Sequence, residues 1–226
     1  MKILITGASK GIGLAEVMQF RNHDLYLVGR SDINIEELGL AGHYFQHDLS
    51  NPDGIQACVK AVTAQTGDID ILINNVGLLV LKKFEDMDEH EINQVLDTNL
   101  RAHMLLTKGL LPLLKAAEYP HIVFMSSMAA KSSIVGESVY AATKAAISNF
   151  ANVLRNEFVG RIKVSTVHAW GVNTWGSKDV DRLLRPEDVA EAVEFIVSRG
   201  PNCLVESIDL GNIHQWRGGE APWSPQ

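Results

Sequence analysis

Short apolar runs alternate with stretches of helical periodicity along most of the chain, and this alternation most restricts the possible folds. Strands separated by helices favour a parallel sheet with helices on both faces, because parallel neighbours need long crossover connections. The predicted strands are residues 2–6, 25–28, 43–47, 69–74, 121–125, 163–168 and 204–209. We therefore expect a doubly wound α/β fold whose ligand binds where the carboxyl ends of the seven parallel strands meet.

Residues 1–211 are expected to form a single domain, followed by an irregular tail over 212–226. The predicted helices run from the first glycine turn to about 20, then to about 66, and over 88–115, 138–157 and 186–198. The length of 226 residues and the hydrophobic content of 46% suit one core.

Charge and composition argue against several partners. The net charge of −7 does not favour a nucleic-acid surface. No apolar run has the length of a membrane span, and the chain begins at once with a strand, so we expect a cytoplasmic protein without a membrane contact. Cys58 and Cys203 are predicted to be buried free thiols, and the eight His show no ligand spacing, so no metal is expected.

The first strand leads directly into a glycine-rich turn, Thr6-Gly-Ala-Ser-Lys-Gly-Ile-Gly13. Glycines at such a turn allow a tight bend, a close approach of the backbone to a pyrophosphate, and packing of the next helix on the sheet. The helix N-terminus offers N–H groups and a partial positive charge. This segment predicts a nucleotide-phosphate site.

The residues after the second strand, Gly29-Arg30-Ser31, include no carboxylate. A carboxylate there would bind the ribose hydroxyls and repel a 2′-phosphate, whereas Arg30 can form two hydrogen bonds to a phosphate. Lys10 adds a second positive charge. The pattern favours NADP(H) over NAD(H), with NAD(H) as the other possibility; alternatively, both cations are ordinary solvated side chains.

Tyr140 and Lys144 are four residues apart, a spacing that places them on one face of a helix. A nearby ammonium favours the phenolate of a tyrosine, whose ordinary pKa is about 10. Ser127 follows a predicted buried strand and can bring a hydroxyl close to the phenol. Taken alone, a Tyr-x-x-x-Lys pair is a common feature of amphipathic helices.

Taken together, these motifs resemble the short-chain dehydrogenase/reductase family, in the order Thr6 to Gly13, Asn74-Asn-Val-Gly77, Asn99, Ser127 and Tyr140-x-x-x-Lys144. The resemblance covers residues 2 to about 211 and implies a Rossmann-like fold. It implies that Asn99, Ser127, Tyr140 and Lys144 are catalytic. It also implies a cofactor site made of Gly7, Ser9, Lys10, Gly11, Ile12, Gly13, Arg30, Asp48, Leu49, Asn75, Gly77, Tyr140, Lys144, Val172 and Thr174.

Two of these roles have structural alternatives. By resemblance, Asn99 holds a water that links Lys144 to solvent, but an amide inside a helix could instead form an interhelix hydrogen bond. By resemblance, Asp48 meets the adenine ring, but Asp48 or Ser50 could instead cap the following helix. The resemblance further implies a homodimer or homotetramer, with a dimer contact through the helices of Asn99 and Tyr140.

The segment after the sixth strand departs from the family pattern. Relatives usually have Pro-Gly where this chain has Ala169-Trp170, although Val172 and Thr174 match. Only ten residues, 175–184, precede the next helix, where many relatives have a longer lid. This implies an open site, or one completed by the tail or another subunit. The tail tryptophans, Trp216 and Trp223, could cover the site, contact a partner or be disordered.

The predicted activity is hydride transfer between NADP(H) and a carbonyl or secondary alcohol. In this hypothesis Tyr140 exchanges the proton, Ser127 binds the substrate oxygen, and Lys144 lowers the pKa of Tyr140 and binds the nicotinamide ribose. Apolar and aromatic residues in the predicted pocket loops favour a small, uncharged substrate. The alternatives are a non-catalytic NADP-binding sensor or scaffold, and epimerisation or dehydration on the same fold.

Overall fold

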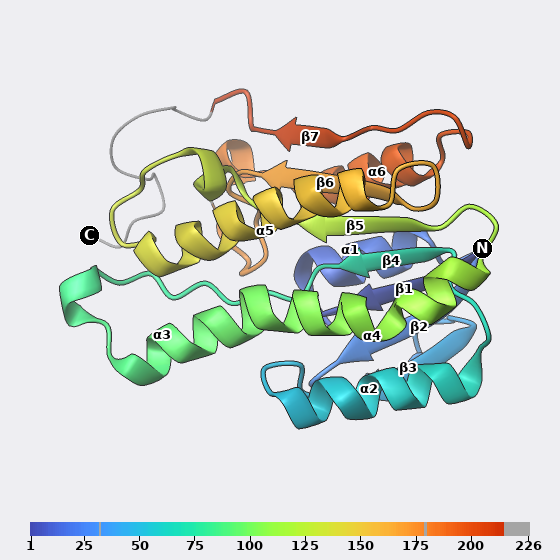
Figure 1. The fold of residues 1–226 in the computed structure, drawn as a ribbon. Helices are drawn as coiled ribbons and strands as arrows, with labels where there is room; N and C mark the ends of the chain where they lie inside the picture. Colours follow the sequence, from blue (N-terminus) through green and yellow to red (C-terminus); the bar gives the residue numbers. More distant parts are fainter. Residues whose placement is uncertain (32, 179, 215–226) are drawn as a thin grey trace.

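The computed structural model describes residues 1–31, 33–178 and 180–214, so Trp216 and Trp223 lie outside the described residues. Within these residues, a seven-stranded parallel sheet has the order β3-β2-β1-β4-β5-β6-β7 (Figure 1). The strands are β1 (Lys2–Thr6), β2 (Asp24–Gly29), β3 (Gly42–Gln46), β4 (Ile71–Asn74), β5 (His121–Met125), β6 (Lys163–Ala169) and β7 (Ser207–Leu210). The strand order reverses at β1 and β4, which creates the crevice expected of a doubly wound sheet and confirms the predicted fold class.

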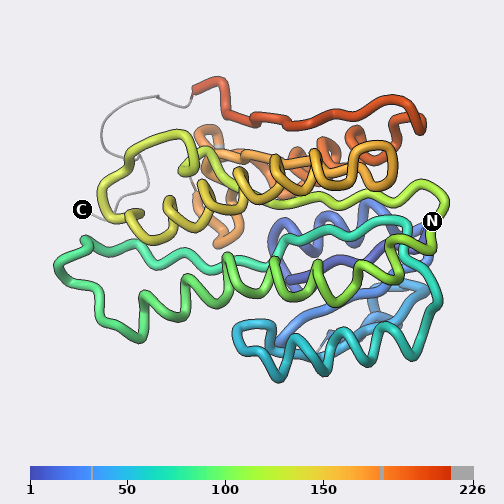
Figure 2. Tube along the Cα trace, viewed as in Figure 1, coloured from blue at the N-terminus to red at the C-terminus, as the bar shows by residue number. Residues whose placement is uncertain are grey.

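Helices cover both faces of the sheet (Figure 2). They are α1 (Gly11–Gln19), α2 (Pro52–Gln65), α3 (Glu89–Leu96), α4 (Ala102–Ala116), α5 (Ser138–Glu157) and α6 (Pro186–Val197), with short 3₁₀ turns at Phe84–Asp86, Met128–Lys131 and Val180–Arg182. Along β1, Leu4 packs toward α2, α4 and α5, whereas Ile3 and Ile5 pack toward α1 and α6. Burial on both faces explains why the strands are continuous apolar runs. Among the described residues, no helix is both long and apolar enough to cross a membrane.

Three predicted features differ in the structure. Cys58 is buried as predicted, but Cys203 is exposed, because it lies in the turn between α6 and β7. The strand β7 begins three residues later than predicted. In the segment before it, the carbonyls of Cys203 and Val205 accept hydrogen bonds from the Lys163 and Ser165 side chains of β6. The predicted helix over 88–115 contains a π-helical turn at Asp97–Arg101, between α3 and α4.

The carboxyl ends of β1 and β4 are tied together through Thr6, which is fully buried. Its hydroxyl oxygen accepts hydrogen bonds from the backbone N–H groups of Asn75 (2.9 Å) and Val76 (3.0 Å) and donates to the carbonyl of Ile73 (3.3 Å). The Asn75 side chain donates in return to the Thr6 carbonyl at 2.9 Å. These bonds fix the segment after β4 beside the glycine turn after β1.

The carboxyl group of Glu16 is completely buried in α1, and neither of its oxygens has a hydrogen-bond partner within the described residues. Burial therefore raises the pKa of Glu16 well above its ordinary value. The folded state holds a proton that the unfolded chain releases above about pH 4.5. Glu16 therefore lowers stability increasingly as the pH rises above that value.

The variant Glu16→Gln should consequently be more stable than the wild type near neutral pH, because it removes the cost of ionising or protonating a carboxyl group in the core. The gain should shrink as the pH falls below about 4.5, where Glu16 is protonated in the unfolded as well as in the folded wild type. Urea unfolding of both proteins across this range measures the difference. A gain that does not change with pH would rule out an ionisation penalty.

Candidate active site

A cavity of about 590 Å³ lies at the carboxyl ends of the strands. The segments that follow β1, β2, β3, β4, β5 and β6 all contribute to its wall. Every predicted cofactor-binding residue except Gly13 lines it, as do the predicted catalytic residues except Asn99. Motifs that are far apart in the sequence therefore meet at one site.

Gly13 and Asn99 lie behind the wall of the cavity and support it. A Cβ at Gly13 would lie 2.1 Å from the Gly7 carbonyl oxygen, a distance that no side chain could tolerate. Gly7 and Gly11 have positive φ angles of 68° and 57°, a conformation that favours glycine. The turn thus brings the N-terminus of α1 to the cavity, where Gly11 and Ile12 are exposed to a ligand.

Two cations line the part of the cavity formed by the segments after β1 and β2. Lys10 and Arg30 are exposed, and neither forms an ion pair within the described residues. Burial acts to raise the pKa of Asp48, but hydrogen bonds from Ser50 and the charge of Arg30 hold it below its ordinary value. The cap of α2 is Asn51, which accepts from Gly54 N at 2.8 Å, so the alternative role of Asp48 or Ser50 as the cap is excluded.

Tyr140 and Ser127 both line the cavity, and their hydroxyl groups lie close together. Burial raises the pKa of Tyr140 to about 12, the adjacent Ser127 hydroxyl opposes this shift, and the carboxyl of Glu137 adds to it. The Ser127 hydroxyl accepts a hydrogen bond from the backbone N–H of Ala129 at 3.1 Å. This bond fixes the orientation of Ser127 relative to the phenol.

Lys144 is almost fully buried, and its Nζ atom donates to the Met125 carbonyl at 2.8 Å. The Nζ atom lies 5.6 Å from the centre of the Tyr140 ring. Burial lowers the pKa of Lys144 to about 8. The ammonium thus lies beside the phenol at the predicted helical spacing, but its hydrogen bond goes to the backbone of β5.

Asn99 lies in the π-helical turn and binds the loop after β4 with both ends of its amide. Its Oδ1 accepts from the Leu78 N–H at 2.7 Å, and its Nδ2 donates to the Leu78 carbonyl at 2.8 Å. Nδ2 also lies 3.3 Å from the Thr143 hydroxyl of α5, the interhelix contact proposed above as the alternative role. Its side chain therefore holds Gly77 and Leu78 against the cavity, while a role in a proton relay remains a prediction.

His103 is a site residue that sequence reasoning missed. It lies one helical turn after Asn99, is fully buried, and donates from Nε2 to the Val76 carbonyl at 2.7 Å. Burial, together with the charge of Lys144, lowers the pKa of His103 to about 3, so the ring is neutral. The spacing of four from Asn99 could have indicated that His103 supports the same loop.

The departure from the family pattern after β6 leaves a regular backbone. Trp170 continues the strand pairing, because its N–H donates to the Leu210 carbonyl at 3.0 Å, and its side chain lines the cavity. Val172 pairs with Leu184, and the Thr174 methyl group lies close to Gly11. Val172 and Thr174 therefore line the cavity, and Thr174 lies beside the glycine turn.

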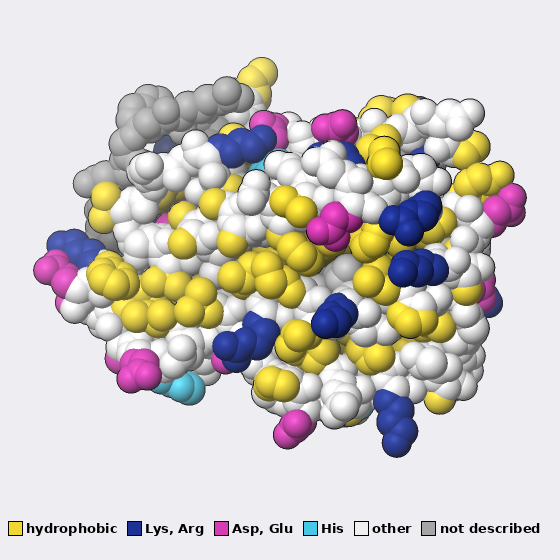
Figure 3. Space-filling view, in the orientation of Figure 1, with side chains coloured by type: hydrophobic (Ala, Val, Ile, Leu, Met, Phe, Trp, Pro, Cys, Tyr) yellow, Lys and Arg dark blue, Asp and Glu magenta, His cyan; other side chains and the backbone are white. Residues whose placement is uncertain are grey.

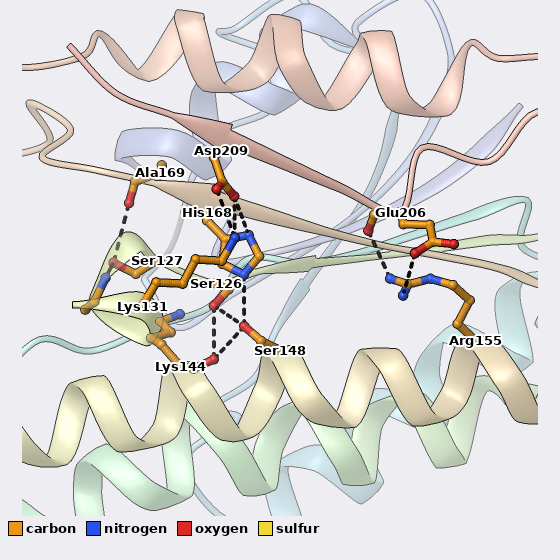
Figure 4. Close-up of polar contacts among 11 residues, drawn as sticks. Ser126, Ser127, Lys131, Lys144, Ser148, Arg155, His168, Ala169, Glu206 and Asp209 are labelled. Atoms are coloured by element: carbon orange, nitrogen blue, oxygen red, sulfur yellow. Dashed lines mark hydrogen bonds and ion pairs between the residues drawn. The ribbon is translucent and has the colours of Figure 1, made fainter. Parts of the chain in front are cut away.

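A chain of hydroxyls lies behind Lys144 (Figure 4). Ser126 and Ser148 both donate to the Lys144 carbonyl, at 3.0 Å and 2.9 Å, and Ser148 lies 3.0 Å from His168 Nε2. His168 Nδ1 is 3.1 Å from Asp209. The order Ser, His, Asp resembles a hydrolytic relay, but Ser148 and His168 do not line the cavity, so this chain braces α5 instead. Within the described residues, no group of three or more His, Cys, Asp or Glu could hold a metal ion.

Comparisons with known proteins identify the family of the chain. The family profile described as short chain dehydrogenase matches residues 1–182. The NADP-dependent 3-hydroxy acid dehydrogenase of Schizosaccharomyces pombe is 31% identical, over 94% of this chain and 93% of that protein. The 3-oxoacyl-(acyl-carrier-protein) reductase of Vibrio cholerae is 29% identical, over 86% of this chain and 88% of that protein.

Solved structures give the same result. Serine dehydrogenase from Escherichia coli has a TM-score of 0.83 and 28% identity, and the match covers 93% of this chain and 97% of that one. A short chain dehydrogenase from Burkholderia cenocepacia in complex with NADP also has a TM-score of 0.83, with 26% identity and 93% and 96% coverage. From the profile match, the curated relatives and the fold, this chain belongs to the short-chain dehydrogenase family of oxidoreductases.

Proposed function

We propose that the protein catalyses reversible hydride transfer between NADP(H) and a carbonyl or secondary alcohol of a small molecule. The observation that carries this proposal is that Ser127, Tyr140 and Lys144 line the same cavity as the glycine turn. A phosphate-binding turn and a proton-transfer group are thereby held within one cleft. This is the combination that a nicotinamide-dependent dehydrogenase requires.

When bound, NADPH supplies the hydride that reduces the substrate carbon. Tyr140 donates its phenolic proton to the carbonyl oxygen, and Ser127 hydrogen-bonds the same oxygen, so that carbonyl, hydride and proton together give the alcohol. Because the pKa of Tyr140 is raised to about 12, the phenol is protonated near neutral pH and can act as the acid. In the oxidative direction Tyr140 accepts the proton, and the nearby Lys144 ammonium favours the phenolate.

The contacts of the cofactor are assigned from the walls of the cavity. Gly11 and Ile12 at the start of α1 would bind the pyrophosphate, and Asn75 and Gly77 would contact the nicotinamide half. Lys10 and Arg30, which form no ion pair within the described residues, line the cavity where a 2′-phosphate would bind. The relative from Schizosaccharomyces pombe, whose name includes NADP dependence, supports the same preference.

We further propose that the protein forms a homodimer or homotetramer through α4 and α5. Hydrophobic side chains gather along these helices in the space-filling view (Figure 3). Among them, Leu105 of α4 and Val153 of α5 are 39% and 46% exposed. Sedimentation equilibrium should give a mass of two or four chains, and a variant with Glu at both positions should shift it toward one. A wild-type monomer would exclude this assembly.

The catalytic assignment is tested with Tyr140→Phe, which removes only the phenolic oxygen. The rate constant for NADPH oxidation with a carbonyl substrate should fall by about 10²-fold or more, the usual contribution of a general acid. NADPH binding, followed by fluorescence titration, provides the control. Normal turnover in this variant would exclude Tyr140 as the acid, and cofactor binding without any net change in NADPH absorbance would favour a sensor, an epimerase or a dehydratase.

The cofactor assignment is tested with Arg30→Ala. Loss of the hydrogen bonds to a 2′-phosphate should weaken NADPH binding by about tenfold to a hundredfold, and NADH binding should change little. Arg199→Ala, which removes an exposed guanidinium after α6, is the matched control. Equal weakening of both cofactors in Arg30→Ala would contradict a phosphate contact.

A further inference from the structure

Glu137 is a buried carboxylate on the substrate side of the cavity, which is the part between the loop after β4 and the start of α5. The residue is 5% exposed and lines the cavity together with Ser127 and Tyr140. Its carboxylate oxygens have no hydrogen-bond or ion-pair partner within the described residues. Burial raises the pKa of Glu137, but its oxygens are not sealed in the core as those of Glu16 are, so a partner can reach them from the cavity.

The backbone holds Glu137 in a fixed place relative to Tyr140. The Glu137 N–H donates to the Ile134 carbonyl at 3.2 Å, and the Glu137 carbonyl accepts from Ala141 N at 2.7 Å. The preceding residue, Gly136, accepts from Lys82 N at 2.9 Å, which joins this turn to the loop after β4. Glu137 lies three residues before Tyr140, so the two side chains project from adjacent turns on the same side of the chain.

Within the described part of the chain, no cation pairs with Glu137. Leu78, Leu79 and Ile134 line the same cavity. The ammonium of Lys144 is occupied by the Met125 carbonyl, and Lys82 pairs with Glu91. Glu137 is the N-terminal cap of α5 but makes no capping hydrogen bond, and the helix end favours a negative charge there. Within the described residues, Glu137 is therefore a carboxyl group on the wall of the cavity without a cation beside it.

We propose that Glu137 binds a protonated amine of the substrate, so that the enzyme acts on amino alcohols and the corresponding amino ketones. This inference rests on the proposed dehydrogenase function and replaces the uncharged substrate that the apolar loops favoured. In the oxidative direction the carbinol carbon gives its hydride to NADP⁺ and the hydroxyl gives its proton to Tyr140, while the ammonium stays paired with Glu137. The carboxylate takes no part in bond making; it determines which molecules bind and how they are oriented.

The test compares ligands that share one carbon skeleton. These are 4-amino-2-butanol, 2-pentanol, in which a methyl replaces the ammonium, and 1,3-butanediol, in which a hydroxyl replaces it. Their binding to the enzyme–NADP⁺ complex is measured by calorimetry near neutral pH. The amine should bind about tenfold to a hundredfold more tightly than 2-pentanol, because its charge is paired away from water. The comparison is repeated with 1-amino-2-propanol against 2-butanol and with 5-amino-2-pentanol against 2-hexanol, because the best chain length depends on the reach of the carboxylate.

The variant Glu137→Gln should remove most of the preference for the amine over its methyl counterpart. Glu89→Gln makes the same change in the exposed first turn of α3, outside the cavity, and should retain the preference. A wild type that shows no preference for any amine, or a Glu137→Gln variant that keeps it, overturns the proposal. Equal binding of 1,3-butanediol and the amine also overturns it, since a neutral donor would then suffice.

The same proteins separate this inference from the proposed function. Formation of NADPH from NADP⁺ and the amino alcohol is followed by absorbance in parallel with binding. An amine that binds selectively without any NADPH being formed would contradict hydride transfer but uphold Glu137 as an ammonium site. Oxidation of the alcohols without selectivity for the amine would uphold the dehydrogenase and reject the role of Glu137.

Discussion

The hydroxyl of Thr6 joins β1 to the end of β4, the two strands at which the strand order of the sheet reverses. It accepts from the backbones of Asn75 and Val76, and the Asn75 amide returns a bond to the carbonyl of Thr6. Gly13 must lack a side chain because the helix after the turn presses against the same junction. The floor of the cavity is thus defined by backbone contacts between two segments that are almost seventy residues apart in sequence.

Much of the active site could be predicted because parallel strands bring their carboxyl ends to one edge. The glycine turn, Ser127 and Tyr140 each follow a strand that the apolar runs identify, so their meeting is a consequence of topology. Supporting contacts were harder to predict. A histidine on an apolar helix face, such as His103, has the pattern of an ordinary core residue, and its bond to Val76 depends on how two distant segments pack.

Other features depend on the conformation of turns, which the hydrophobic periodicity of the sequence does not predict. The burial of Glu137 is set by the turn before α5 and by its bond to the loop after β4. The exposure of Cys203 likewise depends on a turn, although its apolar neighbours favoured burial. The wall of the cavity thus carries Lys10 and Arg30 on the segments after β1 and β2, and Glu137 just before α5.

The π-helical turn at Asp97–Arg101 has a consequence for the register of the whole helix from α3 to α4. A π-helical turn accommodates one residue more than the α-helix around it, so the residues on either side differ in rotational phase. Removal of one residue from this turn would restore regular geometry and rotate everything on one side by about 100° relative to the other. Asn99 and His103 would then no longer both face the loop after β4. The chain length within this short segment is therefore as strictly determined as the identity of the residues in it.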